Sequence, residues 1–129
     1  MRLGYVIVYV PDVRAAVAFY EDAFGLVRRF VHEGGQYAEL ETGATALAFV
    51  DEGFVAQTVG AFAKNQSRQM PAGAEIGLIA DDVASAYEKA LKAGAAPCHA
   101  PLVKPWGQTV AYVRDLNGFL VEICSAMAE

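Results

Sequence analysis

Two glutamates stand in strand-forming apolar segments, where a carboxylate needs a structural or functional reason. Glu75 opens the run Glu-Ile-Gly-Leu-Ile, and Glu122 lies within Phe-Leu-Val-Glu-Ile. If both line one apolar cleft, desolvation and mutual repulsion raise the pKa of at least one carboxyl. Such a group suits general-base chemistry, so Glu122 and Glu75 are candidate catalytic residues. The alternative is that Glu122 is a rim carboxylate hydrogen-bonded to a neighbour.

Aromatic side chains close to this region are candidates for ligand binding. Trp106, the only tryptophan, precedes Gly and Gln108 at the entry to a strand. Its indole could stack on a flat ligand, or it could pack against the edge of the core. Tyr112 lies near the centre of that strand, where a core aromatic is the stronger interpretation. Three further aromatics are expected in the core and not on a ligand: Tyr9, Tyr37 and Phe49.

The other reactive side chains form no recognisable catalytic motif. His32 and His99 fall in connecting segments and are expected at the surface. Cys98 and Cys124 are expected to be reduced thiols, with Cys124 in the core. The sequence contains no Ser-His-Asp arrangement, no phosphate-binding glycine loop and no nucleotide fingerprint.

An internal repeat predicts the elements that position these residues. Residues 5–13 match residues 75–83, and each is a β-prone run that ends in Asp-Val. A helical pattern follows both runs. Asp12 and Asp82 are the expected N-caps, and a glycine is expected to end each helix at its C-terminus. After each helix we expect a further strand or extended segment and then two strands around a turn. The predicted extended segments are 26–32 and 96–103, and the predicted strand pairs are 36–50 and 108–124.

The repeat predicts an α+β fold of two β-α-β-β-β modules in a single domain, residues 1–129, with curved mixed sheets around a shared cleft. The first module covers about residues 1–52, a linker about 53–73, and the second module about 74–129. Within the linker, 54–64 could form a short helix, and the polar part after it is expected to be mobile or to border the site. Neither module can cover its own apolar sheet face, so each must pack on the other or on another chain.

Composition excludes several classes of protein. The chain has 129 residues, of which 55% are hydrophobic and 19% charged, and its net charge is −5. No basic cluster exceeds the pair Arg28-Arg29, which argues against nucleic-acid binding. No apolar run reaches the roughly 18 residues of a membrane span, so we expect a cytoplasmic protein with no membrane partner. The acidic balance favours a neutral or cationic ligand.

Three segments form a pattern that spans nearly the whole chain. Residues 12–26 contain Asp-Val, Phe-Tyr and Phe-Gly-Leu, residues 75–83 are a strand ending in Asp-Asp-Val, and residues 115–122 read Asp-x-x-Gly-Phe-x-x-Glu. This pattern resembles the vicinal oxygen chelate superfamily, which includes the lyase glyoxalase I, extradiol dioxygenases, and fosfomycin- and bleomycin-resistance proteins. Pro-Trp-Gly-Gln at 105–108 is similar to a motif of the bleomycin-resistance branch. The resemblance implies paired modules but no single function, because the superfamily hosts unrelated chemistries.

The resemblance also implies where a metal site would lie. Metal-dependent members take ligands from the start of the first strand and from the last strand of each module, which correspond here to Tyr5, Ala48, Glu75 and Glu122. The internal repeat independently pairs Tyr5 with Glu75, and Ala48 with Glu122. Only Glu122 keeps a usual ligand type, and a phenol is a poor ligand for Zn²⁺ or Ni²⁺ at neutral pH. Two carboxylates could hold Mg²⁺ or Mn²⁺ weakly.

Two functional hypotheses follow. The first is a metal-independent binding or resistance-type protein that holds a small aromatic or cationic molecule, with negative charge from the two glutamates. The alternative is a lyase, isomerase or dioxygenase that uses Glu75 and Glu122 on a divalent ion. The resemblance further implies a homodimer, which exposed sheet edges also favour. The residues expected to bind the ligand are Tyr5, Ala48, Trp106, Gln108 and Tyr112.

Overall fold

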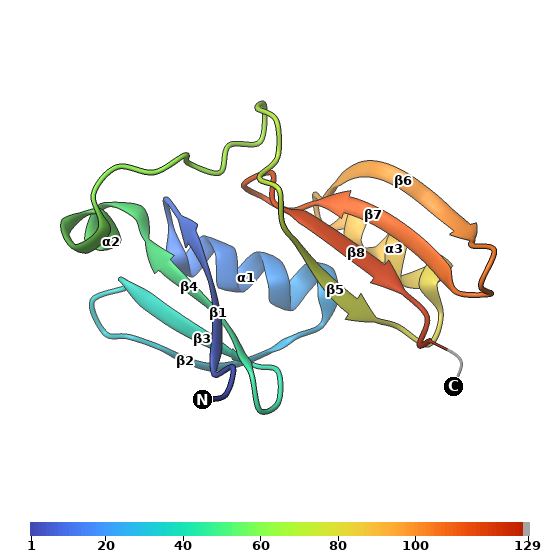
Figure 1. Ribbon diagram of the computed structural model, residues 1–129, viewed down its shortest axis with the longest axis horizontal. Coiled ribbons are helices and arrows are strands. Elements are labelled where there is room, and N and C mark those ends of the chain that lie inside the picture. The colour runs from blue at the N-terminus through green and yellow to red at the C-terminus, as the bar shows by residue number, and fades with distance from the viewer. Residues whose placement is uncertain (128–129) are drawn as a thin grey trace. The chain divides into compact units, whose positions relative to one another are not determined.

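The computed structural model describes residues 1–127, and the last two residues of the predicted second module, 128–129, lie outside this part. The chain divides into two compact units, one of residues 1–64 and one that begins at Asn65. Each unit contains one four-stranded mixed sheet (Figure 1). No helix in the described part of the chain is long and apolar enough to cross a membrane.

The first unit is built as β-α-β-β-β. Its strands are ordered β1-β4-β3-β2, with β1 parallel to β4 and the remaining neighbours antiparallel. The elements are β1 (Tyr5–Val10), α1 (Val13–Phe24), β2 (Val27–Val31), β3 (Tyr37–Glu41) and β4 (Ala46–Asp51).

A short helix, α2 (Glu52–Val59), follows β4 in the first unit. The predicted helix at 54–64 is therefore placed too late in the sequence. Asp51 is the N-cap, because its carboxylate accepts a hydrogen bond from the Phe54 amide at 2.9 Å. The helix stops at Gly60, whose φ of 82° is a conformation that L-residues rarely adopt.

The second unit repeats the same architecture. Its strands are ordered β5-β8-β7-β6, and β5 is parallel to β8. The elements are β5 (Glu75–Ile79), α3 (Val83–Lys92), β6 (Ala96–Val103), β7 (Thr109–Arg114) and β8 (Leu120–Cys124). The predicted α+β fold of two β-α-β-β-β modules is confirmed, and the internal repeat in the sequence corresponds to a repeat in structure.

The predicted caps begin both main helices. The Asp12 carboxylate accepts a hydrogen bond from the Ala15 amide at 3.0 Å, and Gly25 ends α1 in the left-handed conformation with φ 67°. Asp82 accepts from the Ser85 amide, also at 3.0 Å. Each carboxylate satisfies an amide that has no partner within its own helix.

Replacing Asp12 with alanine is expected to lower the free energy of unfolding by about 1 kcal/mol, because an amide of the first turn loses its acceptor. Urea denaturation followed by circular dichroism measures this loss. Asp12→Asn is the matched control, since asparagine is an equally good N-cap and should cost only a few tenths of that energy. Equal losses in the two variants would show that the cap is not the cause.

The core of the first unit lies between α1 and one face of its sheet. Tyr20 of α1 and Phe49 of β4 are almost completely buried, and their ring centroids are 4.9 Å apart. The prediction of a core position is confirmed for Phe49 and wrong for Tyr9 and Tyr37, which are half-buried. Tyr9 packs edge-on against Phe62 at 4.8 Å. Alternation along β1 and β3 directs both tyrosines to the face opposite α1.

The segment that leads into β5 is fastened to the β7–β8 hairpin. The Arg114 guanidinium donates hydrogen bonds to the carbonyl oxygens of Gly118 at 2.8 Å, Gln69 at 2.6 Å and Gln66 at 3.3 Å. A further backbone hydrogen bond joins Gln69 to Gln66 at 3.1 Å. One arginine thus satisfies three carbonyls and secures the approach to the strand that carries Glu75.

Candidate functional site

The face of the second sheet opposite α3, called here the open face, carries both glutamates. Side chains alternate along a strand, so Val121 is buried on the helix side and Glu122 points to the open face. In the parallel pair, Glu75 lies opposite Leu120, and Gly77 lies opposite Glu122. A Cβ built on Gly77 would lie 3.7 Å from Oε2 of Glu122. The Glu122 carboxyl therefore extends over β5 at a residue without a side chain, on the same face as Glu75.

The two carboxyl groups influence each other on this face. The pKa of Glu122 is raised mainly by burial, and its interaction with Glu75, including the negative charge of that carboxylate, raises it further. The positive charge of Lys104 acts in the opposite direction. Glu122 therefore keeps its proton to a higher pH than an isolated glutamate would.

Tyr112 lies beside the carboxyl groups on the same face. It is directly opposite Glu122 in the β7–β8 pair, and both glutamates act electrostatically on its hydroxyl. Burial and then the charges of the two glutamates raise the pKa of the phenol. The interpretation of Tyr112 as a core aromatic is wrong, because the side chain is half-buried and faces the carboxyl pair.

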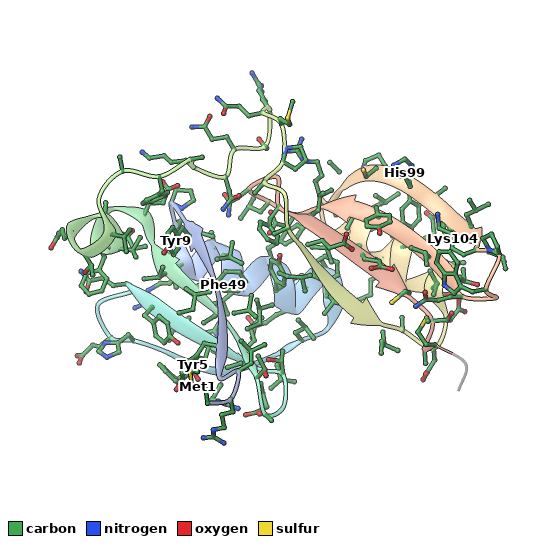
Figure 2. All side chains as sticks on the ribbon, viewed as in Figure 1. Met1, Tyr5, Tyr9, Phe49, His99 and Lys104 are labelled. Carbon is green, nitrogen blue, oxygen red and sulfur yellow. The ribbon has the colours of Figure 1, made fainter. Side chains whose placement is uncertain are left out.

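His99 continues the same row on β6. It lies opposite Tyr112, with ring centroids 6.0 Å apart and the rings edge to face. Figure 2 labels His99 on this strand. His99 is exposed, as expected, but it belongs to a strand of the sheet and not to a connecting segment. His32, by contrast, is exposed in the turn after β2, as predicted.

A pocket of about 400 Å³ opens on this part of the face. Small-molecule sites commonly begin at roughly 300 Å³, so the pocket could hold a small ring system. Its lining combines a cation, two aromatic rings and apolar side chains, contributed by residues 99–102, Lys104, Val110 and Tyr112. Tyr112 lines the pocket and lies directly opposite Glu122 in the sheet, so the carboxyl pair lies on the same face, next to the part of the pocket wall that Tyr112 forms.

Trp106 and Gln108 lie at the β6–β7 turn. The indole N–H donates to the Gln108 side-chain oxygen at 2.9 Å, and the Gln108 amide donates to the Ser125 carbonyl at 2.9 Å. Trp106 is 58% exposed and does not belong to the lining of the pocket beside Tyr112. The neighbouring Cys124 thiol donates to the Leu78 carbonyl at 3.7 Å, and its pKa is raised by burial and by the negative charges of the two glutamates.

The face of the first sheet opposite α1 carries carboxylates that an arginine neutralises. Arg29 donates from Nε and Nη2 to Glu41 at 2.9 and 2.7 Å, and from Nη1 to Glu39 at 3.1 Å. The Tyr37 hydroxyl donates to Glu39 at 2.8 Å. The hydrogen bond from Arg29 lowers the pKa of Glu41. In the second unit, no ion pair within the described residues neutralises Glu75 or Glu122.

Tyr5 and Ala48 occupy the first-unit positions that the repeat pairs with Glu75 and Glu122. Tyr5 is 57% exposed at the start of β1 and lines a pocket of about 400 Å³ together with Arg29. Ala48 is fully buried in β4, opposite Glu39 of β3. Neither side chain repeats the acidic character of its counterpart.

The donor set does not fit the divalent-metal site that the family resemblance implies. Of the four positions, Tyr5 offers a phenol, Ala48 offers no donor, and only Glu75 and Glu122 offer carboxyls. Across residues 1–127, no group of three or more His, Cys, Asp or Glu side chains is placed to hold a metal ion. The raised pKa of Glu122 makes this ligand set poorer still, because ligands must be deprotonated to bind.

Comparisons with known proteins agree with this fold. The sequence profile of the Glyoxalase-like domain matches residues 3–128. A glyoxalase-related enzyme from Fulvimarina pelagi is similar in structure, with a TM-score of 0.83 and 19% identity over 98% of this chain and 88% of that one. A glyoxalase/bleomycin resistance protein/dioxygenase family enzyme from Burkholderia phytofirmans PsJN also gives 0.83, with 21% identity over 97% and 98% of the two chains.

Among curated proteins, the uncharacterized protein YraH of Bacillus subtilis (strain 168) is 27% identical over 127 residues, which are 95% of this chain and 97% of YraH. A structure of lactoylglutathione lyase from Agrobacterium tumefaciens gives a TM-score of 0.71 at 22% identity, over 97% of this chain and 93% of that one. The chain belongs to the Glyoxalase-like domain family, within the vicinal oxygen chelate superfamily that the sequence resemblance predicted.

Sequence analysis missed two residues that line the pocket, His99 and Lys104. For His99 the sequence held an indirect signal, since antiparallel pairing of residues 96–103 with the strand that begins at 109 determines which residue lies opposite Tyr112. The two register shifts within β6 interrupt the regular alternation of side chains, so counting every second residue assigns His99 to the wrong face of the sheet. Lys104 follows the strand, and only the turn geometry directs it to the pocket.

Proposed function

We propose that this protein binds a small, flat organic cation on the open face of the second sheet, and that binding requires no resident metal. The observation that carries the proposal is the Glu75–Glu122 carboxyl pair beside a pocket lined partly by Tyr112 and His99. Once Glu122 is ionised, it presents negative charge that no ion pair within the described residues neutralises. An aromatic ring bearing an amine or amidine would place its charge there and its ring against the two aromatic side chains.

The contrast between the two units supports this assignment. In the first unit, Arg29 already supplies the positive charge that Glu39 and Glu41 require. A ligand cation would have to displace the arginine there, whereas it meets an uncompensated pair in the second unit. Binding without turnover would suit a resistance-type protein, which acts by sequestering its ligand. The raised pKa of Glu122 would also suit proton transfer if the ligand is a substrate.

Amide chemical-shift mapping with benzamidinium, a flat aromatic cation, tests the proposal. We expect a dissociation constant on the order of 1 mM, the affinity usual for a ligand of so few atoms. Shifts should concentrate at His99, Val110, Tyr112 and Glu122. Benzamide is the neutral control of nearly the same shape and should bind at least about tenfold more weakly, since it has no charge for the carboxyl pair. Equal affinities for the two compounds, or shifts confined to the first unit, would contradict the proposal.

Titration with Mn²⁺ tests the requirement for metal separately. Two carboxyls, of which Glu122 has a raised pKa, should bind the ion no more tightly than about 1 mM, because such a site offers few deprotonated ligands. Paramagnetic broadening of the Gly77 and Glu122 amides at micromolar Mn²⁺ would overturn the metal-free assignment. It would favour the divalent-metal alternative.

A further inference from the structure

The pocket on the open face carries a second charged group of the opposite sign. Lys104 follows β6 directly and is half-buried in the pocket wall (Figure 2). Its backbone is fixed by two turn hydrogen bonds, from its own amide to the Gln108 carbonyl and from the Gly107 amide to its carbonyl, both at 2.8 Å. The backbone that carries the Lys104 side chain is therefore held in a defined turn.

Lys104 has no direct anionic partner in the described part of the chain. The ion pairs found there belong to Arg28 and Arg29. Lys104 does act electrostatically on Glu122, so the two charges are near each other without forming an ion pair. Lys104 lines the pocket together with the apolar and aromatic side chains of Leu102, Val110 and Tyr112, and Tyr112 lies opposite Glu122 in the sheet.

A ligand that fills such a pocket must remove water from both charges. A compound with only a cationic end satisfies the carboxyl pair but leaves the ammonium of Lys104 partly desolvated and unpaired, which is costly. A compound with an anion at its far end pairs with that ammonium. Two opposite charges separated by an apolar wall thus select a ligand with the complementary arrangement.

We propose that the natural ligand is zwitterionic, with an amine or amidine at the Glu75–Glu122 end, a flat apolar spacer beside Tyr112 and His99, and a carboxylate or similar anion at Lys104. The inference rests on the proposed function, because it assumes that the cation site on the open face is real. It adds that Lys104 determines specificity. It also narrows the ligand from organic cations in general to those of zero net charge with separated poles.

Calorimetric titration with three probes tests this inference. The probes are 4-(aminomethyl)benzoate, its 3-isomer, and benzylamine, which lacks the carboxylate. At least one isomer should bind the unmodified protein about tenfold more tightly than benzylamine, the factor expected for one added, partly desolvated ion pair. Lys104→Met should bring that ratio close to one and leave benzylamine affinity unchanged or slightly higher.

Lys89→Met is the matched control. Lys89 lies in the last turn of α3 and lines a groove on the helix side, away from the open face. This variant should keep the tenfold preference. A ratio near one for both isomers in the unmodified protein, with benzylamine still bound, would overturn the zwitterion inference and leave the cation site standing. Failure of all three probes to bind would overturn the cation site as well.

Discussion

Replacing Glu122 with glutamine is expected to weaken benzamidinium binding about 10- to 100-fold and, at neutral pH, to stabilise the fold. The loss of binding follows because a charge-assisted hydrogen bond to the ligand disappears, a contribution of about 1.5–3 kcal/mol. The gain in stability follows because the substitution removes a carboxylate that the fold holds in a partly buried position beside another carboxyl. Few substitutions should change binding and stability in opposite directions, which makes the pair of outcomes diagnostic.

The pH dependence of this effect has a definite sign. The folded pKa of Glu122 lies above its ordinary value of 4.5, so ionisation is less favourable in the folded protein than in the unfolded chain. The penalty is absent below the ordinary pKa and develops as the pH rises through the folded pKa. Glu122→Gln should therefore match the unmodified protein at pH 4. At pH 8 it should be more stable by about 0.5 kcal/mol, a small figure because solvent screens a half-buried group.

Cation binding should follow the same titration. Affinity for benzamidinium should increase as the pH rises through the pKa of Glu122, because this carboxyl must release its proton to become charged. The titratable groups that face Glu122 are Glu75, Tyr112, Cys124 and Lys104. Of these, the phenol has its pKa raised above 10 and the thiol above 9, so they stay neutral over the range from pH 4 to 8. In Glu122→Gln the part of this pH dependence that Glu122 contributes should be lost, so the profile should be flatter than that of the unmodified protein.

Glu41→Gln is the matched control, because its pKa is shifted in the other direction. The hydrogen bond from Arg29 lowers the pKa of Glu41, so its ionised form stabilises the fold above its ordinary pKa. This variant should be less stable than the unmodified protein at pH 8, and the difference should shrink as the pH falls. Benzamidinium affinity should not change. A stability change of the same sign in both variants would contradict the electrostatic account.

The second large effect is expected at Gly118, where alanine should lower the free energy of unfolding by about 2–4 kcal/mol. Its φ is 84°, a conformation that costs an L-residue about 1 kcal/mol or more. In addition, an added Cβ would lie 2.7 Å from the Gln66 carbonyl oxygen and 2.9 Å from the Ser67 Cα. Both contacts are backbone, so the segment before β5 must shift to accept the methyl group.

Gly43→Ala separates the two causes. Gly43 lies in the turn between β3 and β4 with φ 95°, and a Cβ there would meet nothing within 4 Å. It should lose only about 1 kcal/mol, the conformational part of the effect. Urea denaturation of both variants measures the difference. Equal losses would show that close approach of the 66–67 segment does not contribute to stability.

Gly118→Ala should also affect the site. The displaced segment is held by Arg114 through the Gln66 and Gln69 carbonyls, and it leads directly into β5 and Glu75. A shift there moves Glu75 relative to Glu122, so benzamidinium affinity should fall in the folded variant. Gly43→Ala should leave that affinity unchanged.

Local rules in the sequence sufficed for much of the fold. Asp12 and Asp82 are N-caps and Gly25 is a left-handed C-cap, because each needs only its immediate neighbours to act. The extended segment predicted at 96–103 coincides with β6. Where local signals were weak, the predicted bounds were wrong. The helix expected at 54–64 begins earlier, because α2 has few strong helix formers and its position depends on the Asp51 cap.

The sequence by itself determined that two like modules exist, and that Glu75 and Glu122 are unusual residues for apolar strands. Only the tertiary structure decided what surrounds them. Pairing of β5, β8, β7 and β6 brings together residues far apart in the chain, so that a pocket lined by Tyr112, His99 and Lys104 forms on the sheet beside the carboxyl pair. The physical reason is that strand register and bulges depend on the packing of whole strands, whereas caps and helix ends depend on a few adjacent residues.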